Sequence, residues 1–284
     1  MTHTILITGA SSGIGEVTAK YFSQKGWNVA ATMRSPHKAG DWAKAPNVMV
    51  SYLDVTKEDT IAAAIQETVD RFGAINVLVN NAGYGLNGPL EGISTQQLAQ
   101  QFQTNVLGLA AVIQHVLPTM RGQKDGTIIN ISSIGGRIAF PLSSAYHATK
   151  FAVEGLSESL RFELKPHNIR VKLIEPGGIK TDFMTRSLQW ATHTAYEPGV
   201  SNMIEMTANL NNNLPGPEGV AAVIYQAAID RTDKLRYTAQ PGPYLLMKQL
   251  LPDSLWRTVV GMSLNAHART QVPESHRQPD RFPQ

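Results

Sequence analysis

The chain has 284 residues, which is long for one average domain but within the range of a single-domain α/β enzyme. Apolar residues make up 42% of the sequence, enough to bury a full core, and the net charge at pH 7 is only +3. Basic and acidic residues are mixed along the chain, which argues against a nucleic-acid partner. Because there is no cysteine, disulfides, thiolate nucleophiles and cysteine-ligated metals are excluded.

The N-terminal residues run directly into a strand-like segment, Thr4–Thr8, without the longer apolar stretch and cleavage site of a secretory signal. No run of about 18 apolar residues occurs, so we expect no transmembrane segment and a cytoplasmic location. The histidines lack the spacing of metal ligands, and no metal site is expected.

Short runs rich in β-branched residues alternate with helix-length amphipathic segments, which predicts a single Rossmann-type, doubly wound parallel sheet of about seven strands with helices on both faces. The strands are expected at Thr4–Thr8, Asn28–Thr32, Val48–Leu53, Asn76–Asn80, Gly126–Ser132, Arg170–Glu175 and Arg236–Ala239. The helices are expected near Ile14–Lys25, Lys57–Phe72, Thr95–Met120, Ala145–Lys165 and Pro217–Ile229.

We expect this α/β domain to span residues 1–240. An insertion at about 183–215, with Met, Trp and Tyr among Thr and Asn, interrupts the alternation. Residues 241–265 carry a further apolar helical pattern, which predicts a helical extension of the same domain. Residues 266–284 are polar, contain proline and lack a period, which is typical of a mobile tail.

A glycine turn, Thr8-Gly9-Ala10-Ser11-Ser12-Gly13-Ile14-Gly15, joins the first strand to the first helix. Gly9 permits a tight bend, Gly13 lets the backbone approach a pyrophosphate, and Gly15 allows close helix–sheet packing. The helix N-terminus then offers N–H groups and a positive dipole to phosphates. Such a turn also occurs as an ordinary βα loop, but its position between strand and helix favours dinucleotide binding.

The end of the second strand distinguishes the two nicotinamide dinucleotides. NAD sites place a carboxylate there for the ribose 2′-hydroxyl, whereas this chain has Met33 followed by Arg34. A guanidinium can bind the 2′-phosphate of NADP in a bidentate manner, although Arg34 could also be a surface residue that ends a strand. We therefore expect NADP(H), with NAD(H) less favoured.

Tyr146 and Lys150 stand four residues apart in a helical pattern and so share one helix face. A neighbouring ammonium favours the phenolate, so we expect Lys150 to lower the pKa of Tyr146 from about 10 and fit it for acid–base work. A hydroxyl where a strand ends could hold a substrate carbonyl, and Ser132 and Ser133 both stand at such an end. Alone, a Tyr–Lys pair of this spacing is common by chance.

In their order and spacing these motifs resemble the short-chain dehydrogenase/reductase family over Thr4 to about Ile229. The glycine turn matches the family's Thr-Gly-x-x-x-Gly-x-Gly motif, and Asn80-Asn81-Ala82-Gly83 matches its Asn-Asn-Ala-Gly segment. Asn105, Ser133, Tyr146 and Lys150 match its catalytic positions, and the thirteen-residue gap to Tyr146 selects Ser133 over Ser132.

The resemblance implies cofactor contacts at Gly9, Ser11, Ser12, Gly13, Ile14, Gly15, Arg34, Asp54, Val55, Asn81, Ala82, Gly83, Tyr146, Lys150, Pro176, Gly177, Ile179 and Thr181. Many NADP-using members carry a basic residue just before the second glycine of the turn, where this chain has Ser12. Arg34 would therefore carry the phosphate preference largely unaided.

The resemblance further implies that Tyr146 exchanges a proton with a substrate oxygen positioned by Ser133, while Lys150 holds the nicotinamide ribose and Asn105 steadies a water that links Lys150 to solvent. The insertion falls at the family's substrate lid, whose apolar side chains either line a pocket for a hydrophobic ketone, aldehyde or alcohol or pack the lid onto the body. The retinol- and 17β-hydroxysteroid-dehydrogenase-like branch is the most similar, and a homodimer or homotetramer is expected.

A non-catalytic NADP-binding regulator on the same fold is the alternative function. The intact set of Asn105, Ser133, Tyr146 and Lys150 argues against it, because a sensor does not need proton-transfer groups.

Overall fold

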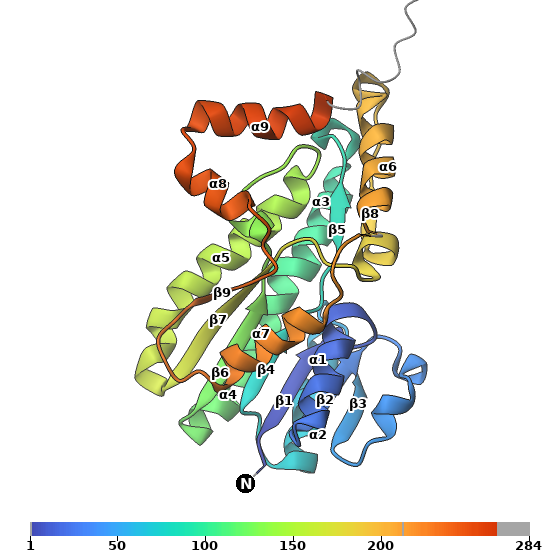
Figure 1. The fold of residues 1–284 in the computed structure, drawn as a ribbon. Helices are drawn as coiled ribbons and strands as arrows, with labels where there is room; N and C mark the ends of the chain where they lie inside the picture. The colour runs from blue at the N-terminus through green and yellow to red at the C-terminus, as the bar shows by residue number, and fades with distance from the viewer. Residues whose placement is uncertain (1, 212, 266–284) are drawn as a thin grey trace, which may run out of the picture.

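The computed structural model describes residues 2–211 and 213–265, so the expected tail at 266–284 lies outside the described residues. Seven parallel strands form one sheet in the order β3-β2-β1-β4-β6-β7-β9 (Figure 1). The strands are β1 Thr4–Thr8, β2 Asn28–Met33, β3 Val48–Tyr52, β4 Val77–Asn80, β6 Gly126–Ile131, β7 Ile169–Pro176 and β9 Arg236–Ala239. The predicted fold class and all seven predicted strands are confirmed.

Helices cover both faces of this sheet, because successive residues of a strand point to opposite sides. Ile5 and Ile7 of β1 join a core cluster with α1 (Gly13–Gln24) and α7 (Glu218–Ile229). Leu6 joins a cluster on the other face, beneath α2 (Glu58–Phe72), α4 (Leu109–Gln123) and α5 (Ser144–Leu164). Strands buried on both sides explain why they read as continuous apolar runs in the sequence.

The strand order reverses beside β1. The chain proceeds from β1 to β2 and β3 on one side and then crosses to β4, β6 and β7 on the other. In open α/β sheets, ligands bind outside the carboxyl ends of the strands at such a reversal. The glycine turn, which follows β1, lies at this point.

The helix expected at Thr95–Met120 is in fact three segments. α3 (Thr95–Phe102) and α4 are joined by a π-helical turn, Gln103–Gly108, which has Asn105 near its centre. Ser94 and Gln97 form a capping box that begins α3. Hydrophobic periodicity does not predict a π turn, because the extra residue in the turn changes the hydrogen-bond pattern without interrupting the amphipathic face.

A second sheet of two short parallel strands was not expected. β5 (Gly85–Asn87) pairs with β8 (Leu188–Trp190), which lies in the insertion. α6 (Gly199–Asn211) follows in the same insertion. A three-residue strand is too short to show an alternating pattern, so only the pairing partner reveals it.

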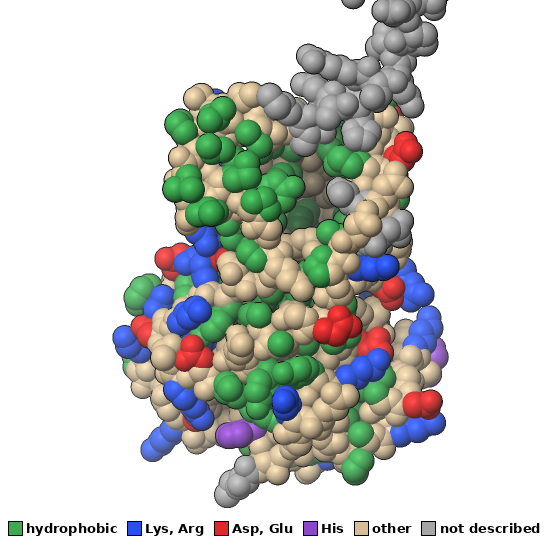
Figure 2. Space-filling view, in the orientation of Figure 1, with side chains coloured by type: hydrophobic (Ala, Val, Ile, Leu, Met, Phe, Trp, Pro, Cys, Tyr) green, Lys and Arg blue, Asp and Glu red, His purple; other side chains and the backbone are tan. Residues whose placement is uncertain are grey.

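Two further helices, α8 (Tyr244–Leu250) and α9 (Asp253–Asn265), follow β9 and lie above α5 (Figure 1). Trp256 of α9 is 5% exposed and belongs to a core cluster with Ile134 and Ile138 from the segment after β6. The outer sides of the two helices keep apolar residues at the surface, namely Tyr244, Leu246, Leu250 and Leu255. Figure 2 shows hydrophobic side chains gathered over this part of the molecule and a hollow between these helices and α6.

Among residues 2–211 and 213–265, no helix is long and apolar enough to cross a membrane.

We expect Trp256→Ala to detach α8 and α9 from the body, because truncating a buried Trp costs about 3–5 kcal/mol. The measurement is limited proteolysis together with thermal unfolding, and cleavage should become faster between β9 and α9. Leu250→Ala is the control, since Leu250 is 72% exposed and its truncation should change the free energy of unfolding by less than about 0.5 kcal/mol. Equal protease resistance of the two variants would contradict the packing role of Trp256.

Candidate active site

Four groups of the predicted site residues follow neighbouring strands at the carboxyl edge of the sheet. The glycine turn follows β1, Asn81–Gly83 follow β4, Ser133 follows β6, and the segment from Pro176 to Thr181 comes at the end of β7. Because β1, β4, β6 and β7 are consecutive in the sheet, the structure brings these segments together along one line.

The glycine turn has the backbone geometry that its residues require. Gly9 has φ +69° and Gly13 has φ +57°, values that side chains with a Cβ rarely adopt. A Cβ on Gly15 would lie 2.4 Å from the carbonyl oxygen of Gly9, so the helix and the turn can approach only if this residue is glycine. Ser12 is the N-cap of α1, but its side chain makes no capping hydrogen bond. The helix therefore begins with N–H groups that no side chain caps, which is a favourable site for a phosphate.

Thr8 and Asn81 hold this turn against β4. The backbone N–H groups of Asn81 and Ala82 donate to the Thr8 hydroxyl at 3.0 and 3.1 Å. The Asn81 side-chain amide donates to the carbonyl oxygens of Thr8 and Gly9 at 2.9 and 3.0 Å. Asn81, expected to contact the cofactor, thus shapes the turn. The sequence did not indicate this role of Thr8, because the partners Asn81 and Ala82 lie 73 and 74 residues further along the chain.

Arg34 and Asp54 lie near each other beyond the ends of β2 and β3. Arg34 is exposed. Burial alone would raise the pKa of Asp54, but hydrogen bonds from Thr56 and the charge of Arg34 hold it below its usual range. Val55 is buried in the core, where it packs against Gly108, so its side chain reaches inward. An exposed guanidinium at this corner is free to meet an anionic ligand.

Ser133, Tyr146 and Lys150 come together. The Ser133 hydroxyl hydrogen-bonds to the Tyr146 phenol and also accepts the N–H of Gly135 at 3.0 Å. The Lys150 ammonium lies 5.7 Å from the centre of the Tyr146 ring and donates to the carbonyl oxygen of Ile131 at 2.9 Å. The Ser132 hydroxyl lies beside Gly136 and binds no partner among the described residues, so Ser133 is the serine that reaches Tyr146.

Burial dominates the protonation of the Tyr–Lys pair. It raises the pKa of Tyr146 to about 12, against the opposing effect of the Ser133 hydrogen bond. It also lowers the pKa of Lys150 to about 8, opposed by the charge of Glu154. The sequence predicted a pKa of Tyr146 below about 10, but its net pKa lies above that value, because the penalty for a buried phenolate is the largest effect. The neutral phenol is the stable form, and it is a proton donor.

Asn105 is buried, and its amide is fully engaged. Its oxygen accepts the N–H of Tyr84 at 3.1 Å, and its nitrogen donates to the Tyr84 carbonyl at 2.8 Å and to the Thr149 hydroxyl at 3.2 Å. Asn105 therefore joins the segment after β4 to α5 beside Tyr146. The expected link from Asn105 to a water stays a prediction, and the side chain itself serves positioning.

His147, next to Tyr146, has a structural role. The N–H of Phe140 donates to its Nε2 at 2.9 Å, so the other ring nitrogen carries the proton and donates to the Gly135 carbonyl at 2.7 Å. Burial lowers the pKa of His147 and keeps the ring neutral. The ring thus fixes the segment from Gly135 to Phe140, which begins directly after Ser133.

The segment at the end of β7 lies beside this group. Pro176 offers its carbonyl oxygen to the Ser133 hydroxyl at 3.5 Å, and the N–H of Gly177 donates to Ala239 at 3.0 Å. Ile179 is buried in the core, whereas Thr181 lies against Gly13 of the glycine turn, where a Cβ would be 3.3 Å from the Thr181 Cβ. The β7 segment therefore connects the catalytic group to the turn.

The insertion closes over the site through Phe183. The Phe183 ring lies 5.8 Å from the Tyr146 ring, and a Cβ on Gly85 would lie 3.1 Å from Phe183 and 2.7 Å from Leu188. The pairing of β5 with β8 holds this contact. Ile138 and Phe140, from the segment after Ser133, pack in one cluster with residues of α8 and α9. The sequence shows that Phe183 is apolar, but it does not show that Phe183 contacts Tyr146.

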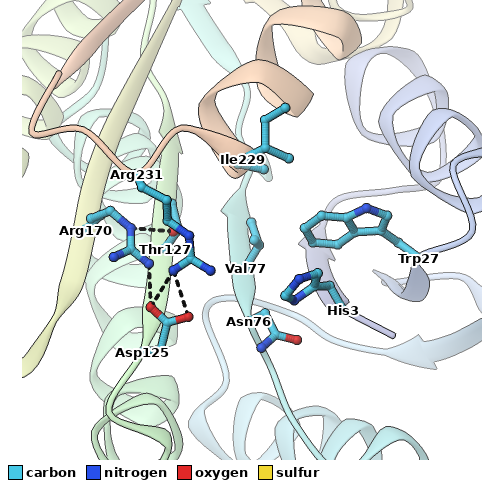
Figure 3. A pocket seen from close by; sticks show the side chains of 10 residues that line it. His3, Trp27, Asn76, Val77, Asp125, Thr127, Arg170, Ile229 and Arg231 are labelled. Atoms are coloured by element: carbon cyan, nitrogen blue, oxygen red, sulfur yellow. Dashed lines mark hydrogen bonds and ion pairs between the residues drawn. The ribbon is translucent and has the colours of Figure 1, made fainter. Parts of the chain in front are cut away.

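A separate pocket of about 120 Å³ lies at the opposite edge of the sheet, where the strands begin (Figure 3). Asp125 there accepts two hydrogen bonds from Arg231 and pairs with Arg170. Although burial alone would raise it, these two guanidinium groups hold the pKa of Asp125 below its usual range. No predicted site residue lines this pocket, so its ion pairs belong to the scaffold.

Within the part of the chain that the structure describes, no group of three or more histidine or acidic side chains could hold a metal ion.

Comparison with known proteins gives a consistent result. The profile of a family described as short chain dehydrogenase matches residues 3–192. The 3-ketodihydrosphingosine reductase of Bacteroides thetaiotaomicron is 34% identical over 257 residues, which cover 88% of this chain and 94% of that protein.

Two solved structures are similar to this fold. A short-chain dehydrogenase from Streptomyces avermitilis has a TM-score of 0.79 and 30% identity, covering 96% of this chain and 99% of that one. ElxO with NADP bound has a TM-score of 0.70 and 30% identity, covering 87% of this chain and 100% of that one.

Proposed function

The chain belongs to the short-chain dehydrogenase family of oxidoreductases, and we propose that it uses NADP(H) to interconvert a ketone or aldehyde with the corresponding alcohol. The observation that carries the proposal is the Ser133–Tyr146 hydrogen bond beside Lys150, at the sheet edge that also holds the glycine turn. This arrangement combines a proton donor with a dinucleotide cradle, which is what carbonyl reduction needs.

The cradle fits a dinucleotide because its glycines leave room for one and no side chain caps the first turn of α1. The segments Gly9–Gly15, Asn81–Gly83 and Pro176–Thr181 would hold the cofactor, with Asp54 and Val55 on the adenine side. When bound, NADPH supplies the hydride for reduction. Arg34 favours the 2′-phosphate, and NADP is the ligand in the similar ElxO structure.

Tyr146 donates its proton to the substrate oxygen in the direction of reduction. Burial keeps the phenol protonated, and the Ser133 hydroxyl orients both the phenol and the incoming carbonyl. Lys150, held by the Ile131 carbonyl, places a positive charge beside the ring, which stabilises the phenolate as it forms. A regulator that only binds NADP would not need these groups, so the catalytic function is favoured.

The substrate that we propose is hydrophobic. Phe183 lies against the phenol, Leu188 approaches Gly85 beside Phe183, and a hollow extends between α6 and the C-terminal helices (Figure 2). The similar protein of Bacteroides thetaiotaomicron, 34% identical over 88% of this chain, is named 3-ketodihydrosphingosine reductase. Apolar surface at the mouth of the site would bind an alkyl chain attached to the carbonyl.

Tyr146→Phe should lower kcat for ketone reduction by about a hundredfold or more, because the proton donor is lost. NADPH binding, measured by fluorescence titration, should stay within about twofold, since the ring remains in place. Tyr84→Phe is the matched control and should keep kcat, because Tyr84 binds Asn105 and Gln101 through its backbone. Undiminished turnover by the Tyr146 variant would contradict the assignment of Tyr146 as the proton donor.

Arg34→Ala should raise KM for NADPH about tenfold or more and leave KM for NADH unchanged, since a charge-assisted bond to phosphate contributes about 1.5–3 kcal/mol. The assay is cofactor oxidation with each dinucleotide. Arg121→Ala removes the same charge from the last turn of α4, which ends where β6 begins, and should change neither constant. A wild-type enzyme that prefers NADH would overturn the cofactor proposal.

For methyl ketones of increasing alkyl length, kcat/KM should rise by up to about fourfold for each added methylene, because burial of one methylene contributes about 0.8 kcal/mol to binding. Ketones of the same length that end in a hydroxyl are the control and should gain less. A rate that is independent of chain length would contradict a hydrophobic substrate.

A further inference from the structure

A cluster of ionic side chains lies one helical turn beyond Lys150; we call Glu154, Glu175, Arg137 and Arg236 the rear cluster. Glu154 of α5 accepts a hydrogen bond from Nε of Arg236 at 3.0 Å. The same nitrogen lies 3.3 Å from Glu175 at the end of β7, and Arg137 lies 3.4 Å from the other oxygen of Glu175. The cluster therefore joins α5, β7, β9 and the segment after Ser133.

Both carboxylates of the rear cluster are buried. The side chain of Glu154 is 7% exposed and that of Glu175 is 0% exposed, while the two arginines reach solvent in part. Burial, together with the charge of Glu154, raises the pKa of Glu175 against the opposing charges of Arg137 and Arg236. A buried ion pair is a weak source of stability, since apolar side chains of the same volume often pack as well. The presence of Glu154 here therefore calls for a reason other than packing.

Glu154 is the acidic side chain closest along α5 to the Lys150 ammonium. Residues four apart on a helix are neighbours on one face, with Cβ atoms about 5–6 Å apart. A Cβ on Gly136 would lie 2.9 Å from the Glu154 side chain and 3.1 Å from the backbone carbonyl oxygen of Lys150, so the Glu154 side chain lies against the turn of α5 that carries Lys150. One carboxylate oxygen of Glu154 finds no hydrogen-bond partner among the described residues, so Arg236 neutralises this side chain only in part.

Of the elements packed against α5, β7 carries Arg170, Lys172 and Glu175, but Arg170 pairs with Asp125 and Lys172 binds the carbonyl oxygens of Thr232 and Lys234. The other elements near Lys150 supply no competing charge. α3, the π turn at Gln103–Gly108, β5 and β6 contain no ionisable side chain. The ionisable groups of α5 one turn from Lys150 are thus Tyr146 and Glu154, with Glu175, Arg137 and Arg236 behind Glu154, whereas the His147 ring binds Gly135 and Phe140. Tyr146 and His147 are neutral, as described above.

We propose that Glu154 is a positioning residue that holds Lys150 in its charged form, and that Arg236 and Glu175 keep the Glu154 carboxylate in place for this purpose. The role of that charge in turnover rests on the proposed function, whereas the effect of Glu154 on Lys150 does not. An unpaired ammonium buried beside a phenol would lose its proton more readily than one with a carboxylate a helical turn away. The charge that Lys150 presents to Tyr146 would then depend on the rear cluster.

The sign of the effect follows from the charges. Burial lowers the pKa of Lys150 to about 8, and the negative charge of Glu154 opposes that shift. Removing the charge leaves burial unopposed, so the pKa of Lys150 falls further. Lys150 would then be uncharged over part of the neutral range, where the wild-type side chain is charged.

The test is a pH titration of Lys150 in the full-length protein, followed by NMR of lysines labelled at Cε. The Lys150 signal is identified by its loss in Lys150→Arg. We expect a midpoint near 8 in the wild type and a midpoint lower by about one pH unit in Glu154→Gln. Glu154→Asp keeps the charge and should restore most of the shift. Glu154→Met, of similar volume, serves in its place if the Gln variant does not fold.

Glu158→Gln is the matched control. Glu158 binds the same Arg236 at 2.8 Å and lies on the same helix, but it is 56% exposed and two turns away from Lys150. Its variant should titrate like the wild type. A fall in the Glu154 variant that the Glu158 variant does not share supports the proposal. Equal midpoints in the wild type and Glu154→Gln, or equal falls in both variants, overturn it.

Turnover gives a second measurement that a packing defect would not reproduce. In Glu154→Gln, kcat/KM for ketone reduction should be about tenfold lower than wild type above pH 8 and within about twofold at pH 6, since one pKa unit changes the protonation ratio tenfold. An equal loss at all pH values would indicate a structural role alone and overturn the proposal. If the wild-type enzyme reduces no ketone, the proposed function fails, while the Lys150 titration still decides the role of Glu154.

Discussion

The packing of α5 on the sheet is the interaction on which the rest of the site depends. The inner face of this helix, including Val153 and Leu164, is buried with β6 and β7 in one core cluster. Because the helix is rigid, burying that face also sets the positions of Tyr146, Lys150 and Glu154 relative to Ser133. At about 1.5–3 kcal/mol for each large apolar side chain, this burial is ample to hold polar groups in an unfavourable environment.

That environment determines the chemistry more strongly than the Tyr–Lys pair does. Burial favours the neutral form of both groups, although their pKa values differ little in free solution. Tyr146 therefore keeps its proton more firmly, and Lys150 loses its proton more readily. The surrounding polar contacts then refine the result. Ser133 opposes the shift at Tyr146, and Glu154 opposes the shift at Lys150.

Segments far apart in the chain reach the site through backbone hydrogen bonds and aromatic contacts. Asn105 binds Tyr84 across 21 residues, and His147 fixes the segment that begins after Ser133. The insertion is held at the site by the pairing of β8 with β5, which places Phe183 against the Tyr146 phenol. The C-terminal helices pack through Trp256 against the segment from Gly135 to Phe140, which His147 also holds. Each connection supports a different wall of the site.

The alternation of strand and helix, the glycine turn and the order of Asn105, Ser133, Tyr146 and Lys150 were enough to predict the sheet, its seven strands and the candidate catalytic group, because these features depend on local periodicity and spacing. Features that depend on a distant partner could not be predicted from local patterns. They are the π turn at Asn105, the β5–β8 pair, the contact of Phe183 with Tyr146, and the rear cluster, whose members come from α5, β7, β9 and the segment after Ser133. The protonation of Tyr146 and Lys150 was also decided only in the folded protein. A side chain's pKa depends on how much water and which charges surround it, and that surrounding exists only when the chain has folded.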